Sequence, residues 1–318
     1  MLDLKALIAE AGSIGISGHV KPDGDCVGSV MGLYNYIKHV FPEKEVHAFI
    51  EPPASIFRFL SNTDKIESEW KEDYKLDLFF ALDCGDKERM GRFVPLYEAA
   101  KKKINIDHHI SNNSFGDENF VLPDASSTSE MVFSLMDTED ITKEVAECLY
   151  VGIAHDTGVF QYSCTSPSTM NAAGELMKKG IDFTDILTKT YFEFTYEQNK
   201  MLATAIVNAK RYFKNQCIAS TITRSEMKKY NARYSDLEGI VSHLRATKGV
   251  DVSIFLYETA KPGELKLSLR SQSIVDCAKI SACYGGGGHV RAAGATIVSD
   301  DIEGALEDVI KKVGEQLS

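Results

Sequence analysis

The chain has 318 residues, of which 44% are hydrophobic and 25% charged, and its formal net charge is -11. This length suits two domains of ordinary size, and the composition excludes a disordered or fibrous protein. The negative charge opposes tight binding to long duplexes, because Lys and Arg supply most non-specific affinity for phosphate backbones. We therefore expect no long duplex partner, and any nucleic-acid substrate has to be short.

The seven cysteines are scattered without a C-x-x-C pair, which predicts reduced, mostly buried thiols rather than disulfides or a cysteine zinc site. The sequence has no apolar run of the length that spans a bilayer, and residues 1–12 lack the pattern of a signal peptide. We expect a cytoplasmic protein without a membrane partner.

Up to about residue 190, short apolar strands alternate with helical patterns, which predicts an α/β domain with a mainly parallel sheet flanked by helices. The segment after Ser166-Pro167 reads as a helix that reaches Lys179, and Gly180 ends it. The other expected elements are strands at 13–17, 46–50, 76–82 and 103–106, helices at 27–39 and 96–102, and, less clearly, a strand at 149–154.

Residues 194–211 read as a longer helix, which predicts a linker helix at 191–214 between a first domain at 1–190 and a second at 215–318. The second domain is expected to be a smaller α/β domain. Its expected elements are strands at 217–223, 250–257, 265–270 and 292–298, helices at 236–245 and 275–282, and a closing amphipathic helix at 302–317.

Acidic and imidazole side chains recur just beyond the expected strands of the first domain. Ligand sites in open α/β sheets gather beyond the carboxyl ends of the strands, so these side chains are predicted to converge on one metal site. The residues concerned are His19, Asp23 and Asp25 in one tight loop, Asp83, Asp107-His108-His109, and Asp156. Taken singly, the loop also suits a polar turn, and Asp83 and Asp156 also suit helix caps.

Carboxylate oxygens with imidazole nitrogens favour Mn²⁺, with Mg²⁺ or Co²⁺ as alternatives. Two such ions about 3.5 to 4 Å apart can drive in-line phosphoryl displacement, so the sequence predicts phosphoester hydrolysis. Asp83 is expected to bridge the ions from a central strand, and a histidine not bound to metal would protonate the leaving oxygen. We expect His155 to be a packing residue.

In the second domain, Gly285 to Gly288 lie between a helix and a strand, with His289 and Arg291 directly after them. Such a run can cradle a phosphate with its backbone amides, although glycine runs also form flexible linkers. Arg270 ends an expected strand and can pair with a phosphate through two hydrogen bonds, or lie exposed at the surface.

As a set, these motifs closely resemble the DHH/DHHA1 phosphoesterases, and within them the bacterial oligoribonuclease and 3′-phosphoadenosine 5′-phosphate phosphatase group. The resemblance covers nearly the whole chain. The matching residues are His-Val-Lys-Pro-Asp-Gly-Asp at 19–25, Asp83, Asp-His-His-Ile-Ser-Asn at 107–112, Ser-Ser-Thr-Ser-Glu at 126–130, Asp-Thr-Gly-Val-Phe at 156–160, Ser-Leu-Arg-Ser at 268–271 and Gly-Gly-Gly-Gly-His at 285–289.

The resemblance implies a role for each of these residues. His19, Asp23 and Asp83 would hold one manganese, and Asp25, Asp83, His108 and Asp156 the other. Asp83, His109 and Asp107 would be the catalytic set, with His109 facing the substrate and Asp107 orienting a ligand. The residues that would grip the nucleotide are Arg270, Ser271, Gly286, Gly287, Gly288, His289 and Arg291.

The resemblance also implies a function. We expect hydrolysis of RNA of about two to five nucleotides to mononucleotides by a two-metal site, and dephosphorylation of 3′-phosphoadenosine 5′-phosphate to AMP. The alternatives are a phosphodiesterase for linear or cyclic dinucleotides and a nucleotide-binding regulator without turnover. Family members are often dimers, so a homodimer is a possible assembly.

Overall fold

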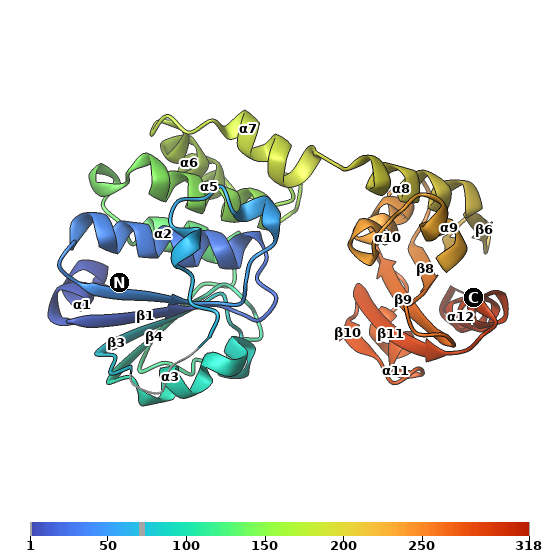
Figure 1. The fold of residues 1–318 in the computed structure, drawn as a ribbon, viewed down its shortest axis with the longest axis horizontal. Coiled ribbons are helices and arrows are strands. Elements are labelled where there is room, and N and C mark those ends of the chain that lie inside the picture. Colours follow the sequence, from blue (N-terminus) through green and yellow to red (C-terminus); the bar gives the residue numbers. More distant parts are fainter. Residues whose placement is uncertain (1, 70–73, 318) are drawn as a thin grey trace. The chain divides into compact units, whose positions relative to one another are not determined.

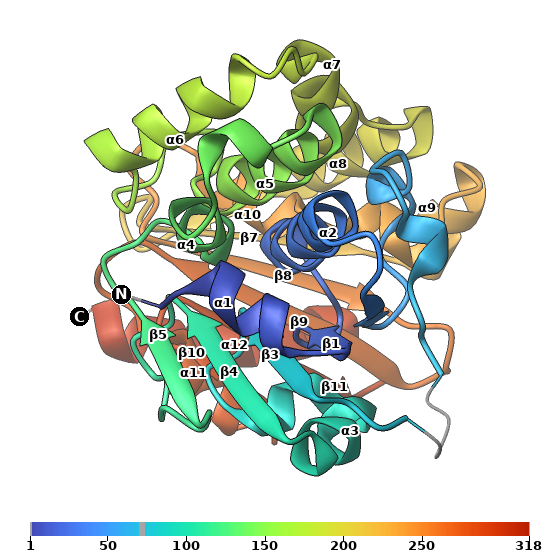
Figure 2. The same cartoon turned by 90° about the vertical axis from the view of Figure 1, so that its left-hand side faces the viewer.

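The computed structural model describes residues 2–69 and 74–317, which fall into two compact units that divide after Glu193. In the described part of the first unit, five parallel strands form one sheet in the order β2-β1-β3-β4-β5 (Figures 1 and 2). The strands are β1 Ser13–Ser17, β2 Glu45–Phe49, β3 Leu78–Leu82, β4 Lys102–Asp107 and β5 Glu118–Val121. The helices are α1 Leu4–Glu10, α2 Gly24–Val40, α3 Val94–Ala99, α4 Thr128–Ser134, α5 Lys143–Asp156, α6 Pro167–Met177 and α7 Phe183–Leu187.

Strand β3 lies at the centre of this sheet and is buried on both faces. Leu78, Phe80 and Leu82 pack into a core shared with α2, α4 and α5, whereas Phe79 packs with Tyr97 of α3 on the opposite face. Continuous burial of this kind is typical of a parallel strand between two layers of helices. The predicted fold class is confirmed for this unit.

The expected strand at 149–154 is wrong, because these residues form the second half of helix α5. Thr142 caps this helix, and its residues from Val145 to Ala154 are almost all buried. A helix that is apolar on every side has no visible 3.6-residue period, so its run of apolar residues reads like a buried strand. Gly28 of α2 permits the close packing of the two helices, since a Cβ there would lie 2.5 Å from the carbonyl oxygen of Cys148.

The second unit holds a mixed sheet whose described strands run in the order β10-β11-β9-β8-β7-β6, with β7 and β8 parallel and the other pairs antiparallel. The strands are β6 Lys210–Tyr212, β7 Cys217–Ile222, β8 Val252–Glu258, β9 Glu264–Ser271, β10 Gly287–His289 and β11 Ala292–Val298. The helices are α8 Tyr196–Asn208, α9 Arg224–Lys229, α10 Ile240–Arg245, α11 Cys277–Ala282 and α12 Ile302–Leu317.

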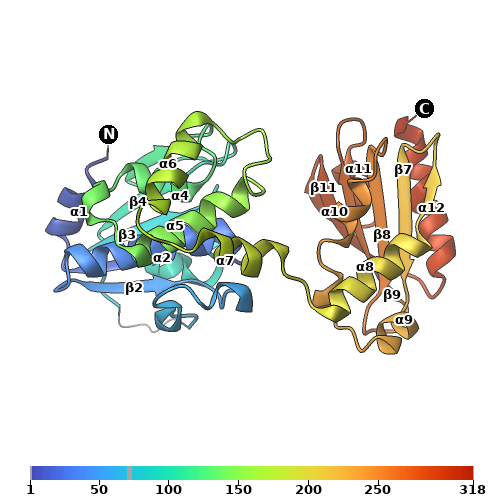
Figure 3. The same ribbon diagram turned by 90° about the horizontal axis from the view of Figure 1, so that it is seen from above.

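Two hydrophobic cores lie on opposite faces of this second sheet. Helices α8 and α10 pack on one face, and α11 and α12 on the other. Figure 3 shows α10 and α12 on opposite sides of β7 and β8. Helix α8 is shorter than the expected helix at 194–211, since Arg211 already belongs to β6. The expected helix at 236–245 begins only at Ile240, because Gly239 takes a left-handed φ of 79°.

Neither β5 nor α9 was expected from the sequence, since each is short and half exposed. The seven cysteines are free and five of them are buried, as predicted. Within residues 2–69 and 74–317, the helices are all too short or too polar to cross a bilayer.

Candidate metal centre

Asp83 directly follows the central strand β3, as predicted, and its side chain is only 3% exposed. Its φ of 56° lies in the left-handed region, which non-glycine residues seldom adopt and which is often strained at functional sites. Its amide donates to the carbonyl oxygen of Ile106, and the hydroxyl of Thr128 lies 3.3 Å from its Oδ1. The carboxylate is therefore held firmly at the carboxyl edge of the sheet.

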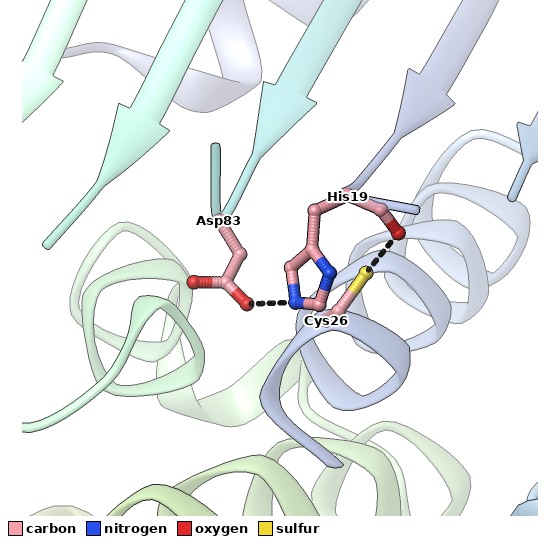
Figure 4. Close-up of side chains that lie close together, drawn as sticks. All are labelled: His19, Cys26 and Asp83. Atoms are coloured by element: carbon pink, nitrogen blue, oxygen red, sulfur yellow. Dashed lines mark hydrogen bonds and ion pairs between the residues drawn. The ribbon is translucent and has the colours of Figure 1, made fainter. Parts of the chain in front are cut away.

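The chain after β1 brings His19, Asp23 and Asp25 to the same edge. The expectation of one tight loop is wrong for Asp25, because Asp23 is the N-cap of α2 and Asp25 lies in the first turn of that helix. Asp23 accepts from the amides of Asp25 and Cys26, as N-cap carboxylates commonly do. In Figure 4 the side chains of His19 and Asp83 point toward one another, with Nε2 and Oδ2 3.4 Å apart.

Helix α4 fixes the buried carboxylate of Asp25. The first-turn amides of Thr128 and Ser129 donate to its two oxygens at 2.7 and 2.9 Å. Anions are stabilised at such helix starts. The sequence interpretation missed this contact, although the polar run 126–130 ahead of an apolar segment is a recognisable helix start.

Glu130 holds that helix start in place and was also missed as a structural residue. Its carboxylate accepts from the amide and hydroxyl of Ser126, from Thr169 Oγ1 at 2.9 Å and from Ser168 Oγ at 2.7 Å. Burial alone would raise the pKa of Glu130, but these hydrogen bonds lower it. A charged, fully bonded carboxylate thus supports the turn that binds Asp25.

Strand β4 ends in Asp107, and His108 and His109 follow it. The buried Asp107 accepts from Asn112 at 2.6 Å and lies 2.7 Å from Nδ1 of His109. The hydrogen bond to Asp107 raises the pKa of His109. Asp107 therefore orients His109, whose side chain is 43% exposed.

Asp156 completes the cluster from the last residue of α5, and not from a strand end. Its Oδ2 lies 3.2 Å from Nε2 of His108, and that nitrogen lies 3.6 Å from Oδ1 of Asp83. His155 points the other way and packs against Phe57, with ring centroids 5.1 Å apart. The structure therefore brings Asp25, His108 and Asp156 within metal-binding distance of one another.

The carboxylates of this cluster place several negative charges close together in the protein interior. The ion-pair partners of Asp23, Asp83 and Asp156 are histidine nitrogens. Burial and the nearby Asp83 carboxylate raise the pKa of Asp156 to about 7, and the same causes raise the pKa of Asp25. Carboxylates in this situation need either protons or a cation.

The donor atoms fit a hard divalent cation. His19 Nδ1 lies 2.9 Å from the carbonyl oxygen of Val20, an acceptor, so Nδ1 carries a hydrogen, and Nε2 faces Asp23 and Asp83. Burial would lower the pKa of His19, but its contacts with Asp23 and Asp83 raise it to about 10, so Nε2 needs either a proton or a cation between it and the two carboxylates. Oxygen and imidazole donors in this ratio suit Mn²⁺ or Mg²⁺.

Cys26 lies near His19 and Asp83, but its thiol points away from the carboxylate (Figure 4). Its Sγ donates to the carbonyl oxygen of His19 at 3.7 Å. Burial, and then the charge of Asp83, raises the pKa of this thiol well above its ordinary value. Cys26 thus fixes the backbone of the His19 loop as a neutral thiol.

In the second unit, the sheet register divides the residues predicted to bind substrate. Ala292 of β11 pairs with Arg270 of β9 and with His289 of β10, so these three residues share one face. Arg270 and His289 lie two strand spacings apart, about 10 Å. Ser268 and Arg270 also line a cavity of about 480 Å³ on this face, together with Tyr234, Phe255 and Tyr257.

Ser271 belongs to the opposite face, where its hydroxyl donates to the carbonyl oxygen of Val275. Arg291 lies in the turn between β10 and β11 and donates to the same carbonyl oxygen at 3.2 Å. The structure therefore does not bring Ser271 and Arg291 together with Arg270.

The glycine run is a built turn and not a flexible linker. A Cβ at Gly286 would lie 2.3 Å from the carbonyl oxygen of Gly294, and Gly288 has a φ of 139°. By contrast, Gly287 has free space around its Cα and lies on the Arg270 face, paired with Gly294. Close approach of the backbone to a ligand is open at this position.

Comparison with known proteins places this architecture in a family. The DHH family, N-terminal domain, matches residues 13–153, and the DHHA1 domain matches residues 214–318. The bifunctional oligoribonuclease and PAP phosphatase NrnA of Thermus thermophilus is 30% identical over 99% of this chain and 93% of its own length. The chain belongs to the DHH/DHHA1 family of phosphoesterases.

Solved structures agree with this assignment. An exopolyphosphatase-related protein from Bacteroides fragilis shares 29% identity and superposes with a TM-score of 0.84 over 98% of this chain and 94% of its own. The exonuclease RecJ bound to manganese has a TM-score of 0.53 at 13% identity, covering 98% of this chain and 92% of its own, a likeness that shows the fold alone. The similarity in sequence to the NrnA group rests on relatives that are 28 to 31% identical over more than 90% of this chain.

Proposed function

We propose that this phosphoesterase hydrolyses short oligoribonucleotides to mononucleotides and dephosphorylates 3′-phosphoadenosine 5′-phosphate to AMP. The observation that carries the proposal is the buried cluster of carboxylates and histidines at the carboxyl edge of the sheet. The similarity to the Thermus oligoribonuclease and PAP phosphatase, at 30% identity over nearly the whole chain, supports the substrate class.

We assign two divalent ions, Mn²⁺ in the first place, to this cluster. His19, Asp23 and Asp83 would hold one ion, and Asp25, Asp83, His108 and Asp156 the other. When bound, such ions supply an activated water and stabilise charge on the phosphoryl oxygens. The protein's own contribution is positional, because α4 holds Asp25, Thr128 restrains Asp83, and Nδ1 of His19 is fixed by Val20.

His109 is assigned to the leaving group. Its Nδ1 is bonded to Asp107, which favours the protonated ring and leaves Nε2 as the free donor. A proton held at Nε2 can pass to the departing oxygen as the phosphoester bond breaks. Asp107 would act through His109 and would not touch the substrate.

The second unit is assigned to the nucleotide. On one sheet face, Arg270 and His289 offer a guanidinium and an imidazole to a phosphate, and Gly287 leaves room for the ligand beside the backbone. Ser271 and Arg291 both donate to the carbonyl oxygen of Val275, so they would stabilise the end of the sheet and not contact the nucleotide. Gly286 and Gly288 would fix the backbone on either side of Gly287.

The test is a comparison of initial rates for RNA dimers to pentamers, 3′-phosphoadenosine 5′-phosphate and a cyclic dinucleotide, with Mn²⁺ and then with Mg²⁺. We expect turnover of the dimers and of the bisphosphonucleotide, and loss of most of this turnover in Asp83→Ala. Selective turnover of cyclic dinucleotides would move the chain to the alternative phosphodiesterase. Nucleotide binding without any turnover would favour a regulator.

A further inference from the structure

The chain that leaves the metal centre at Asp156 follows an unusual path. Gly158, Val159 and Phe160 all have left-handed φ values, of 56°, 56° and 64°. A β-branched residue such as Val159 is a clear outlier there, and strain of this kind clusters at functional sites. The turn returns Tyr162 to the end of α5, because its amide donates to the carbonyl oxygen of Thr157 at 2.9 Å.

The ring of Tyr162 covers Gly158, two residues after Asp156. A Cβ at Gly158 would lie 2.4 Å from Cζ of Tyr162, so only a glycine lets the ring pack flat on the backbone. Yet Tyr162 remains 56% exposed. One side of a large aromatic ring is thus fixed, and the rest of the ring faces solvent beside a predicted metal ligand.

Further aromatic side chains lie between Tyr162 and Gly24 at the start of α2. Tyr191 comes from the π-helical turn Thr188–Phe192, a rare element that is frequent at functional sites. Burial and the neighbouring Tyr162 raise the pKa of Tyr191, and the Tyr191 ring lies 5.8 Å from that of His155. His155 in turn covers Gly24, where a Cβ would lie 2.4 Å from its Cγ.

Gly24 is the residue between Asp23 and Asp25, so this row of rings begins at the predicted ligands and ends at the surface. Phe57 packs against the His155 ring and is 3% exposed, whereas Phe192, which packs against Tyr191, is 54% exposed. We call Phe57, His155, Tyr162, Tyr191 and Phe192 the aromatic row. Within this row, the ring of Tyr162 packs on the backbone at Gly158.

We propose that Tyr162 is a stacking platform for a nucleobase of the substrate whose phosphate lies at the metal centre. The proposal rests on the proposed function and deepens it, because it places base recognition in the first unit as well. Aromatic side chains bind single-stranded nucleotides by stacking, irrespective of base identity. The platform therefore predicts a preference for ligands with a base and little preference among the bases.

The test is the equilibrium binding of AMP and ribose 5-phosphate to the full chain with Mn²⁺, measured by calorimetry. Both ligands carry a 5′-phosphate, and only AMP carries a base. We expect wild type to bind AMP about tenfold more tightly or better. Tyr162→Ala should weaken AMP binding by about the same factor and leave ribose 5-phosphate unchanged, whereas Tyr162→Phe should keep the preference.

Tyr196→Ala is the matched control, since Tyr196 is 70% exposed on α8 and lies outside the aromatic row. If Tyr162→Ala does not fold, Tyr162→Leu keeps the contact with Gly158 but removes the aromatic face, and it should lose the AMP preference. Equal weakening of both ligands, or unchanged AMP binding, would overturn the platform. AMP is the expected product of the proposed reaction, so its binding does not depend on turnover. A base preference without RNA turnover would retain the platform and refute the proposed function.

Discussion

Gly152 offers the sharpest test of how packing of the first unit positions the metal centre. It lies on α5 against the start of α4, where a Cβ would stand 1.9 Å from Ser129 Oγ and 2.8 Å from Asp25 Oδ1. The variant Gly152→Ala therefore pushes directly on a predicted ligand. Its matched control is Gly174→Ala on α6, where a Cβ meets no atom of the described chain within 4 Å.

The size of the effect follows from two opposing contributions. Alanine in place of glycine within a helix stabilises the fold by up to about 1 kcal/mol, and this contribution alone should appear at Gly174. At Gly152 it is opposed by overpacking, which costs about 1–3 kcal/mol. The difference in unfolding free energy between the two variants thus measures the overpacking. Displacement of Asp25 by about 1 Å should also slow hydrolysis about 100-fold.

Chemical denaturation and initial rates with Mn²⁺ test this expectation on both variants. We predict that Gly174→Ala is at least as stable as wild type and fully active, whereas Gly152→Ala is less stable than this control and nearly inactive. A Gly152→Ala protein with wild-type activity and the stability of the control would refute the claim that α5 and α4 jointly fix Asp25.

Other expectations test single contacts in each unit. Asp251 is 7% exposed and accepts from the hydroxyl of Ser273 and from the amides of Ser273, Ile274 and Val275; burial would raise its pKa, but these bonds lower it. Asp251→Asn should therefore cost the second unit about 1–3 kcal/mol in urea unfolding at neutral pH. Because the pKa of Asp251 is lower in the folded than in the unfolded chain, where it is near 4, its charge stabilises the fold above about pH 4. The difference in unfolding free energy between wild type and Asp251→Asn should therefore shrink as the pH falls below about 4. A difference that does not change with pH would contradict this. Cys26→Ala should leave the number of bound Mn²⁺ ions unchanged, because the thiol bonds to a carbonyl oxygen; loss of an ion in mass spectrometry of the native protein would make Cys26 a ligand.

The sequence predicted those parts of the site that depend on burial. Asp83 follows five consecutive buried apolar residues, and a carboxylate at such a place needs a partner. The sequence motif at 107–109 was equally readable, because three adjacent ionisable groups at a strand end have few structural uses. Position along a buried strand is thus enough to identify a candidate ligand when the strand is short and apolar throughout.

The sequence failed where tertiary packing decides the structure. Residues 149–154 are helical because α5 packs closely against α2 through Gly28, a contact that no local pattern reveals. The hydrogen bond from the Thr128 amide of α4 to Asp25 joins residues that are 103 positions apart. The face shared by Arg270 and His289 depends on the register of the strands. Long-range contacts of this kind follow from the fold and not from neighbouring residues.

The central claim is that the buried carboxylates and histidines hold paired divalent ions. Calorimetric titration of the metal-free protein with Mn²⁺, for wild type and Asp83→Asn, tests it most directly. We predict two Mn²⁺ per wild-type chain and a severe loss of affinity for both in Asp83→Asn, because Asp83 faces both His19 and His108. A wild-type protein that binds no Mn²⁺, or an Asp83→Asn protein that binds two ions as tightly as wild type, would contradict the account.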